Sequence, residues 1–514
     1  MSPLREFESF ESIADAVMYQ ATERGDAAYL LAARGEGIVT FRQLSERAKI
    51  WHHAMSAPHP HESERWGIMV SDPLEFAVCF IGLMSAGILV APLDPTATNV
   101  NAELFQERLV RLRLHGVVSD RPAPPGTVVE WITTVDAFPE RNAGQSLTSK
   151  ISSGGLILSS SGTTGTPKVV TLSANQLLRT AHLVAHHHEL GPNERGLNPL
   201  PLWHVNAEVV GLLATLVAGA SLVVDERFHR TDFWAVAERH NVTWINAVPA
   251  IIARLVTLRE GELVPSGIRF VRSASAPLSP AIIEQFESVI GINIVESYGM
   301  TEAASQICAN PVDGPRKIGS VGPPVGVELR ITPTDDVTLE TESRALVGHV
   351  EVRGVTVITA YDAPGYENRF DSSGWLRTGD LGYLDEDGYL YIVGRTDDVI
   401  NRGGEKIFPR EIEEVVERVK GILEASVIGV PDDVFGQVPV LFVTLDETVE
   451  GRTPSTLESI GVQVNDMIVA NFARTRRPVI IHFVDAMPAH AIGKVQKRQL
   501  AAGSVPIIYS LSVK

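Results

Sequence analysis

Leu156-Ile157-Leu158 runs directly into Ser159-Ser160-Ser161-Gly162-Thr163-Thr164-Gly165-Thr166-Pro167-Lys168. The apolar run predicts a strand, and the hydroxyl- and glycine-rich loop after it suits a polyphosphate. Glycine lets backbone N–H groups approach phosphate oxygens, the hydroxyls add donors, and Lys168 adds a positive charge. A flexible linker of this composition rarely follows a buried strand or ends in Pro-Lys. The loop therefore predicts a site for nucleotide phosphates.

The spacing of this loop differs from that of the common P-loop. A P-loop has four residues between its two glycines and then Lys-Ser or Lys-Thr at once. Here Gly162 and Gly165 are three positions apart, and Pro167 precedes Lys168. The pattern thus favours a nucleotide site and argues against an ordinary P-loop NTPase.

Composition restricts the class of protein. The 514 residues are 44% hydrophobic and 21% charged, as in a globular protein of about three to four domain-sized units. The formal charge of -18 argues against a nucleic-acid or anionic-membrane surface, since both need clustered positive charge. Two cysteines, Cys79 and Cys308, exclude a disulfide framework and fit a reducing cytosol. Residues 1–6 carry no apolar signal segment, so we expect a cytoplasmic protein, as a monomer or a homodimer.

Two uncharged stretches need a choice between membrane spans and buried elements. In residues 76–93, Gly82, Gly87 and Pro92 interrupt the apolar pattern, which divides into a helix to Ala86 and a strand at 88–90. The second stretch, 209–224, is shorter and rich in small residues. Both predict buried α/β elements and no membrane span.

Apolar strands alternate with amphipathic helices along most of the chain, which predicts an α/β fold with largely parallel or mixed sheets. We expect a helix at 175–188 capped by Ser173, and strands at 67–70, 221–224, 243–248, 268–271 and 292–295. From Gly348 the pattern changes to short β-rich pieces. After Gly394-Arg395-Thr396-Asp397-Asp398 comes a unit with its own alternation. We expect a helix that starts at Pro409 and runs through 411–419, a second helix at 457–472, and strands at 425–430, 439–445 and 479–484. We therefore predict a large N-terminal domain, 1–396, and a smaller α+β domain, 397–514.

Five further segments carry candidate chemistry. The first is Tyr298-Gly299-Met300-Thr301-Glu302, in which an aromatic ring and a glycine stand beside a carboxylate. Such a set can stack a purine and hold Mg²⁺. A structural turn explains Tyr298 and Gly299 equally well. Thr378-Gly379-Asp380 is predicted to lie in a turn and to present a carboxylate to ribose, with a capped turn as the alternative. The others are Arg395 at the boundary, the glycine pair in Arg402-Gly403-Gly404-Glu405-Lys406, and Gly493-Lys494.

Two histidine-containing segments are weaker candidates. Adjacent His186, His187 and His188 cannot all face one metal ion, so we do not expect a metal site there. His204, after Trp203, precedes a buried segment and can line a pocket, with a hydrogen-bonded core histidine as the alternative.

Taken together and in this order, the segments resemble the adenylate-forming superfamily of acyl-CoA synthetases, peptide-synthetase adenylation domains and luciferases. The likeness extends from about Phe41 to Leu500. It implies that a carboxylate attacks the α-phosphate of Mg·ATP, that pyrophosphate leaves, and that an acyl-adenylate forms. The smaller domain then rotates about a hinge, and a second nucleophile, such as CoA, displaces AMP.

The resemblance also implies roles for individual residues. The phosphates would be held by Ser160, Ser161, Gly162, Thr163, Thr164, Gly165 and Lys168. Glu302, with Thr164, would bind Mg²⁺, and Lys494 would bridge the attacking carboxylate and the phosphate during adenylation. The adenosine would be bordered by Ser275, Ala276, Pro277, Ser297, Tyr298, Gly299, Met300, Thr301, Asp380 and Arg395. The acyl pocket would include Trp203, His204, Ser297 and Gly299, with Asp397 as hinge and Gly403, Gly404 and Lys406 along the acceptor path.

The C-terminal region departs from the superfamily pattern and leaves the acceptor open. Thioester-forming members usually show Lys-x-Pro and then Leu-Pro-Arg/Lys-Thr before the catalytic lysine, whereas this chain has 473–478 as ARTRRP and 487–491 as MPAHA. The middle of the chain, 272–303, looks like the short- and medium-chain or dicarboxylate CoA synthetases. One reading is a CoA ligase. Another is an amide-forming ligase of the coronafacic acid ligase type, in which an amino acid is the acceptor. A carrier-protein-loading domain, a luciferase-like enzyme and a non-catalytic adenylate binder are more distant readings.

Overall fold

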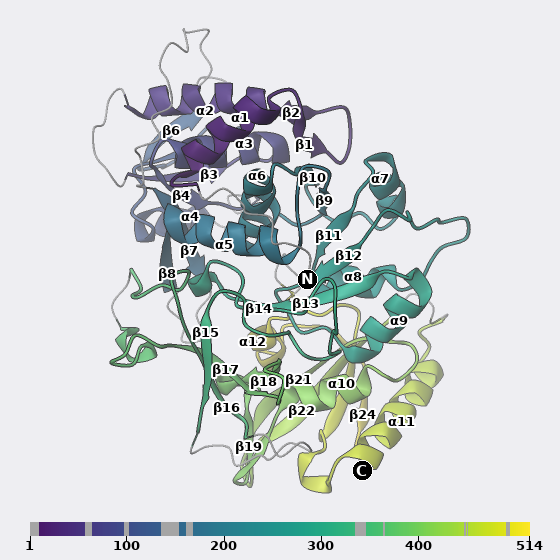
Figure 1. Ribbon diagram of the computed structural model, residues 1–514. Coiled ribbons are helices and arrows are strands. Elements are labelled where there is room, and N and C mark those ends of the chain that lie inside the picture. The colour runs from purple at the N-terminus through teal and green to yellow at the C-terminus, as the bar shows by residue number, and fades with distance from the viewer. Residues whose placement is uncertain are drawn as a thin grey trace.

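The computed structural model describes residues 10–56, 64–96, 102–134, 154–160, 168–334, 346–362, 365–446, 449, 451–489 and 494–513. Within them the strands form four sheets. Three of the sheets lie before residue 396, and the fourth, drawn in light green and yellow in Figure 1, follows it.

The largest sheet has the order β14-β13-β12-β11-β9-β10-β1-β2 in the described residues. Strands β13 to β1 along this order pair in parallel, and β14 and β2 are antiparallel at the two edges. The carboxyl ends of the parallel strands therefore meet at one edge, where ligands bind in open α/β sheets. Its strands are β1 (Ala28–Ala32), β2 (Ile38–Thr40), β9 (Arg195–Asn198), β10 (Ser221–Val224), β11 (Trp244–Ala247), β12 (Phe270–Ser273), β13 (Asn293–Tyr298) and β14 (Cys308–Ala309).

The second sheet, β6-β5-β3-β4-β7-β8, is parallel except for the last pair. It contains β3 (Arg65–Met69), β4 (Leu89–Pro92), β5 (Gly116–Ser119), β6 (Glu130–Thr133), β7 (Gly155–Ser160) and β8 (Lys168–Ser173). The predicted strand at Leu156-Ile157-Leu158 is β7. Because β7 and β8 are antiparallel, the Cα atoms of Ser160 and Lys168 lie opposite each other, on the two sides of the predicted phosphate loop.

Helices accompany both sheets. They are α1 (Ile13–Arg24), α2 (Phe41–Ser56), α3 (Pro73–Ser85), α4 (Ala102–Arg111), α5 (Ala174–His187), the π-helix η2 (Ala207–Leu213), α6 (Ala214–Ala218), α7 (Phe233–Arg239), α8 (Pro249–Leu255) and α9 (Pro280–Ile290). Ser173 caps α5 as predicted, and Gln176 completes a reciprocal capping box. The uncharged stretch from Phe76 is the buried part of α3, followed by β4, as predicted. No helix of the described residues is both long and apolar enough to serve as a membrane span.

The third sheet is an antiparallel meander of β15 (Glu328–Thr332), β16 (Gly348–Arg353), β17 (Leu376–Leu384) and β18 (Leu390–Arg395). Thr378 and Asp380 lie inside β17, so the predicted turn at Thr378-Gly379-Asp380 is wrong. The physical reason is long-range pairing: β17 runs alongside β18 and sets Asp380 opposite Arg395. The Thr378 hydroxyl donates to the carbonyl of Val350 on β16 at 2.9 Å.

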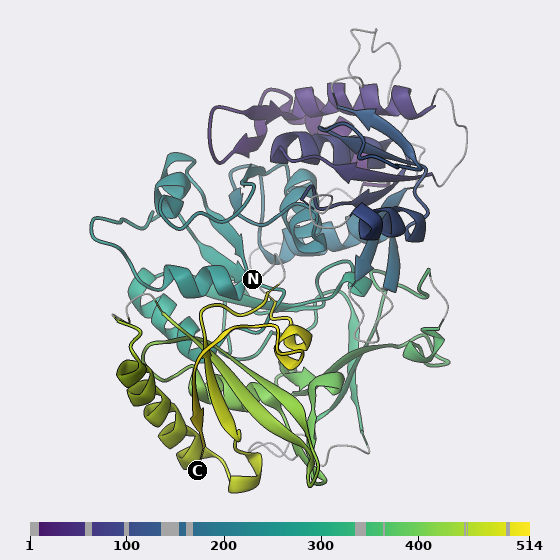
Figure 2. The same cartoon turned by 180° about the vertical axis from the view of Figure 1, so that it is seen from behind.

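The C-terminal part has a sheet and an apolar core of its own. The sheet contains β19 (Ile400–Arg402), β20 (Glu405–Ile407), β21 (Ile422–Asp432), β22 (Gly436–Leu445), β23 (Ile480–Val484) and β24 (Ile507–Ser512), with helices α10 (Pro409–Val416), α11 (Pro454–Asn471) and α12 (Lys497–Ala501). Its main buried cluster contains only residues from Ile400 onward. A smaller cluster joins Phe408 to Val347 and Leu381 across the predicted boundary. Seen from both sides, α12 lies where this part faces the rest of the molecule (Figures 1 and 2).

The predicted fold class, a mixed α/β protein with a large N-terminal domain and a smaller C-terminal domain, is confirmed. Element ends differ by a few residues: β12 is displaced toward the C-terminus and includes Arg272, β13 extends to Tyr298, and α10 ends at Val416. Asp397 lies in the short 3₁₀ turn η5 (Thr396–Asp398). The division at residue 396 and the hinge at Asp397 stay predictions.

Candidate active site

The predicted phosphate loop is framed by the two strands that flank it. Ser161, Gly162, Thr163, Thr164 and Gly165 lie outside the described residues, and Ser160 is described only as the last backbone position of β7. Lys168, the first residue of β8, is 6% exposed. Its Nζ lies 5.3 Å from the ring centroid of Tyr361 and 5.1 Å from that of Tyr366, a cation–π arrangement. The aromatic rings thus hold the cation at the end of the loop, where β8 begins.

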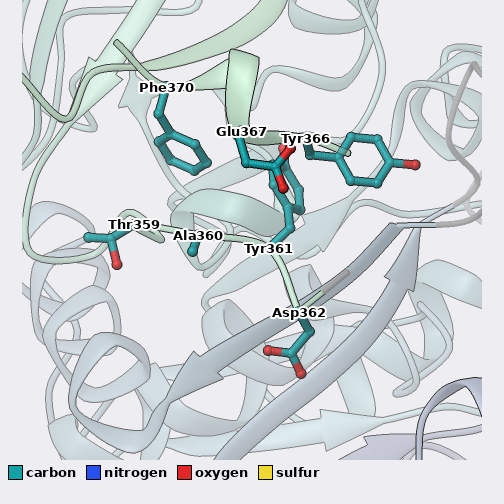
Figure 3. Close-up of a pocket in the computed structure, with 7 residues that line it drawn as sticks. All are labelled: Thr359, Ala360, Tyr361, Asp362, Tyr366, Glu367 and Phe370. Atoms are coloured by element: carbon teal, nitrogen blue, oxygen red, sulfur yellow. The ribbon is translucent and has the colours of Figure 1, made fainter. Parts of the chain in front are cut away.

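Both rings also line a pocket of about 320 Å³ (Figure 3). It is lined by Thr359, Ala360, Tyr361, Asp362, Tyr366, Glu367 and Phe370. Tyr361 links this pocket to the candidate metal ligand, because its hydroxyl donates to Oε1 of Glu302 at 2.9 Å. Burial lowers the pKa of Lys168 and Arg369 lowers it further, while Glu302 opposes the shift. Lys168, Tyr361 and Glu302 therefore form one polar group.

Glu302 sits in the 3₁₀ turn η3 (Thr301–Ala303), directly after β13. Its side chain is 6% exposed, and its backbone carbonyl accepts from the N–H of Ile358 at 2.9 Å. Hydrogen bonds to both its carbonyl and its carboxylate fix the position of the residue. A fixed carboxylate oxygen is the kind of ligand that Mg²⁺ prefers. Thr164, the other predicted metal ligand, lies outside the described residues.

Tyr298, Asp380 and Arg395 are brought together from β13, β17 and β18. The Tyr298 hydroxyl donates to Oδ2 of Asp380, and Nε of Arg395 lies 3.5 Å from Oδ1 of the same carboxylate. Burial raises the pKa of Asp380, and Arg395 and Tyr298 oppose that rise. Burial lowers the pKa of Arg395, but the nearby carboxylates of Asp380, Asp398 and Asp397 outweigh it and raise the pKa overall.

Lys494 brings the C-terminal domain to this group. It lies between β23 and α12, beside the isolated bridge Ala489↔Val495. Burial lowers the pKa of its ammonium group, and Arg395 lowers it further. Asp380, Asp398 and Glu302 favour the charged form. The Lys494 ammonium group therefore interacts with residues on β17 and β18 and with residues just after β13 and β18, although its role in adenylation stays a prediction.

The predicted adenosine-binding segments border the same edge of the large sheet. Ser275, Ala276 and Pro277 follow β12, and Ser275 has φ = +76°, in the left-handed region that L-residues rarely adopt. The Ser297 hydroxyl donates to the carbonyl of Ser273 at 2.9 Å and so ties β13 to the end of β12. Thr301 and Met300 are partly buried beside them. The strained backbone at Ser275 singles out this turn as a candidate binding element.

Gly299 has a packing reason that its sequence context did not reveal. A Cβ at this position would lie 1.4 Å from the carbonyl oxygen of Ser305, so the chain's own backbone occupies the space. The backbone of the turn after η3 thus lies against Gly299 where we expected a ligand. A role of Gly299 in the acyl or adenine pocket stays a prediction.

The predicted acyl and acceptor residues lie on different elements. Trp203 and His204 are partly buried before η2, with ring centroids 6.4 Å apart. Gly403 and Gly404, with φ of +60° and +96°, form the exposed two-residue turn between β19 and β20, and Lys406 lies on β20. A hairpin turn with two left-handed residues favours glycine, so the pair has a structural reason besides any ligand.

Comparison with known proteins identifies the family. The model of the AMP-binding enzyme family matches residues 17–362, and that of the AMP-binding enzyme C-terminal domain matches residues 411–494. The chain belongs to the AMP-binding enzyme family. As a member of this adenylate-forming superfamily it is an ATP-dependent acid ligase.

Named relatives of this AMP-binding enzyme are CoA ligases. The sulfoacetate–CoA ligase of Cupriavidus necator is 34% identical, over 97% of this chain and 99% of the relative. The oxalate–CoA ligase of Arabidopsis thaliana is 30% identical, over 83% of this chain and 86% of the relative. Among solved structures, ATP-bound MatB from Rhodopseudomonas palustris has a TM-score of 0.83 at 24% identity, covering 95% of this chain and 98% of that one, which shows the fold.

Two residues of the AMP-binding enzyme's site were absent from the sequence prediction. Tyr361 contacts Glu302 from 59 positions away, and no local motif marks it. Arg272 was missed because strand 268–271 was predicted to end before it. An arginine inside Phe270–Ser273, a strand with every residue buried, was the available signal. The triple histidine, by contrast, ends α5, and His188 is its buried cap.

Proposed function

We propose that this AMP-binding enzyme activates a small carboxylic acid with Mg·ATP and transfers the acyl group to the thiol of CoA. The observation that carries the first half is the electrostatic interaction of Lys494, from the C-terminal domain, with Asp380, Arg395 and Glu302. Cations beside the reacting phosphate stabilise the charge that develops as it is attacked. Support for a thiol acceptor comes from CoA ligases that are similar over most of the chain.

In the first step a carboxylate oxygen of the acid forms a bond to the α-phosphorus, and the bond from that phosphorus to the bridging oxygen breaks. Pyrophosphate leaves, with its charge held by the 160–168 loop and Lys168. Lys494 lies between the carboxylate and the α-phosphate and lowers their repulsion. Asp380 and Arg395 hold the ribose, and Tyr298 borders the adenine. Glu302 and Thr164 would hold Mg²⁺, which would neutralise phosphate charge.

In the second step the CoA sulfur attacks the acyl carbon, and AMP leaves with the electrons of the acyl–oxygen bond. We propose that the C-terminal domain rotates about Asp397 between the steps. Gly403, Gly404 and Lys406 would then line the path of the incoming chain. The exposed turn at Gly403 and Gly404 has no side chain to obstruct such a path.

One incubation tests this proposal. The enzyme is mixed with Mg·ATP, a panel of acids that includes sulfoacetate, oxalate, acetate and propionate, and either CoA or mixed amino acids. Products are read by mass spectrometry, in which thioesters and amides differ in mass. We expect a CoA thioester with stoichiometric AMP. An amide product, with no thioester from any acid, would replace CoA by an amine as the acceptor.

A further inference from the structure

Arg272, on β12, is buried and has no carboxylate partner among the residues that the structure describes. It is 1% exposed, and Nη1 donates to Oδ1 of Asn206 at 2.8 Å and to Oδ1 of Asn246 at 3.3 Å. Nη2 donates to Oε1 of Gln306 at 3.4 Å. In the part of the chain that the structure describes, every hydrogen-bond partner of this guanidinium is a neutral amide. Burial lowers the pKa of Arg272 to about 9, which still leaves the group positively charged at neutral pH.

Other arginines near this sheet have carboxylate partners. Arg316 pairs with Glu287 at 2.5 Å, and Arg269, three positions before Arg272, pairs with Glu194 at 3.0 Å. Both are more exposed than Arg272 and therefore lose less hydration. Burying a charge without a counter-ion is strongly unfavourable, and native proteins rarely tolerate it without a functional reason. The missing partner of Arg272 is thus an anion.

Glu208, a buried acid two residues after Asn206, does not supply that anion. It lies in η2 and is fully buried, and neither carboxyl oxygen has a hydrogen-bond partner among the described residues. Burial raises the pKa of Glu208 well above its ordinary value, which favours the neutral form of the group. Burial alone accounts for the lowered pKa of Arg272, with no contribution from Glu208.

Three hydrogen-bond donors around the guanidinium are also unused. Nε of Arg272, Nδ2 of Asn206 and Nε2 of Gln306 are buried and have no partner in the described residues. The amide oxygens of Asn206 and Gln306 accept hydrogen bonds from the guanidinium, so the N–H₂ groups of the same amides lie close to it. Buried donors are normally satisfied. A ligand oxyanion, which only accepts hydrogen bonds and can accept several, satisfies all three.

This cluster lies beside the predicted acyl pocket. Asn206 comes two residues after His204, at the start of η2. Gln306 follows Ser305, whose carbonyl packs against Gly299. Ser273, next to Arg272, accepts the hydrogen bond of Ser297. The acyl-pocket residues thus surround the carboxyl ends of β12 and β13, and Arg272 stands within the same edge of the sheet.

We propose that Arg272, with the amide groups of Asn206 and Gln306, binds a second acidic group of the substrate while the first carboxylate is adenylated. The substrate class is then a short acid that carries two anionic groups, the second being a carboxylate or a sulfonate. This inference rests on the proposed function, because it concerns the acyl pocket of that same reaction. It concerns the acid alone and is independent of the acceptor.

The test compares acids that differ in the second charge. ATP–pyrophosphate exchange is measured with malonate, oxalate and sulfoacetate, and with acetate and propionate as singly charged acids. We expect kcat/KM for at least one doubly charged acid to exceed that for both singly charged acids by about 10²-fold. The carboxylate and sulfonate members of the panel distinguish the two chemical forms of the second group.

Variants then assign the discrimination to Arg272. Arg272→Met should lower kcat/KM for the preferred doubly charged acid by about 10²-fold and change that for acetate far less, since only one acid loses a partner. Arg272→Lys, which keeps the charge, should retain part of the preference. Arg269→Met removes a neighbouring arginine that already has carboxylate partners and should leave the ratio unchanged. ATP binding, measured by calorimetry, verifies that each variant is folded.

Two outcomes overturn the inference. One is a wild-type enzyme without preference for any doubly charged acid in the exchange assay. The other is an equal loss for both classes of acid in Arg272→Met, or, where that variant does not bind ATP, in Arg272→Lys. Failure of the proposed acceptor has a different signature. The preference for doubly charged acids would then persist in pyrophosphate exchange, while no thioester would form with CoA.

Discussion

Arg395 and Arg272 are two arginines of the same active-site region with opposite surroundings. Arg395 lies 3.5 Å from Asp380, and Asp397 and Asp398 help to raise its pKa. Among the described residues Arg272 has amide partners only, and burial lowers its pKa. The nucleotide side of the site thus carries its own counter-ions, while the acyl side holds a charge that a ligand must neutralise. The first arrangement suits ribose, a neutral group, and the second suits an anion.

The largest effect is expected at Lys494, the residue of the C-terminal domain that lies near Asp380 and Arg395, on the nucleotide side. Lys494→Ala should lower ATP–pyrophosphate exchange by about 10²–10³-fold while ATP still binds, because the loss concerns charge that develops during the attack. Exchange rate and ATP affinity are measured separately. Lys420→Ala, an exposed lysine of the same domain, serves as the matched control. Undiminished exchange in Lys494→Ala would remove the lysine from the first step.

Asp380→Asn gives Arg395 an amide neighbour in place of a carboxylate, as Arg272 has. The substitution removes the carboxylate nearest to Arg395 but keeps an acceptor for the Tyr298 hydroxyl. We expect ATP to bind about 10–100-fold more weakly, since a charge-assisted hydrogen bond contributes about 1.5–3 kcal/mol. Calorimetric titration with ATP measures the change. If the affinity stays the same, Asp380 serves only to neutralise Arg395 and does not hold the ribose.

The same variant should also move the pH profile. The pKa of Lys494 is lowered mainly by burial, and Asp380 favours its charged form. If the ammonium ion is the active form, exchange is full at low pH and falls as pH rises through the lowered pKa. Asp380→Asn should therefore shift this alkaline limb to lower pH. An alkaline limb that stays in place, at saturating ATP, would mean that another group controls it.

The smallest effect is expected at Glu296, a buried acid of β13. Burial raises its pKa to about 8. The folded protein therefore holds a proton that the unfolded chain releases near pH 4.5, and this acid reduces stability progressively as pH rises from about 4.5 to 8. Glu296→Gln should thus be more stable than the wild type at pH 8 and gain much less at pH 5.

Thermal unfolding at the two pH values measures that difference. Gln keeps an oxygen that can accept from the N–H of Gly319, now 3.1 Å from Oε2. Glu284→Gln changes an exposed glutamate of α9 and should leave the melting temperature unchanged at both pH values. An equal shift for Glu296→Gln at pH 5 and pH 8 would mean that packing, and not ionisation, causes it.

The sequence was sufficient for the elements that local patterns specify. Leu156-Ile157-Leu158 predicted β7, Ser173 predicted the cap of α5, and Pro409 predicted the start of α10. These features depend on neighbours within a few positions, so a single sequence contains them. The motif Tyr298–Glu302 likewise pointed to the end of β13, where the structure has the candidate metal ligand.

Features set by distant pairing could not be predicted in this way. Asp380 faces Arg395 because β17 and β18 pair in one register, and nothing within Thr378–Asp380 specifies that partner. The position of Tyr361 against Glu302 and the surroundings of Arg272 depend on contacts between residues 26 to 66 positions apart. The motifs were sufficient to predict which residues lie on the nucleotide side. The charge balance of the acyl side could be seen only in the folded chain.

Rotation of the C-terminal domain has a free-energy cost if it exposes Phe408. It is fully buried beside Val347 and Leu381, which come before the predicted hinge, although Phe408 comes after it. Burying a phenylalanine side chain contributes about 1.5–3 kcal/mol. A rotation about Asp397 that exposes Phe408 would reduce the population of the rotated conformer about ten- to a hundredfold in the free enzyme. The chain would then rest in the arrangement that holds Lys494 in place, and differential binding of a ligand would supply the free energy to leave it.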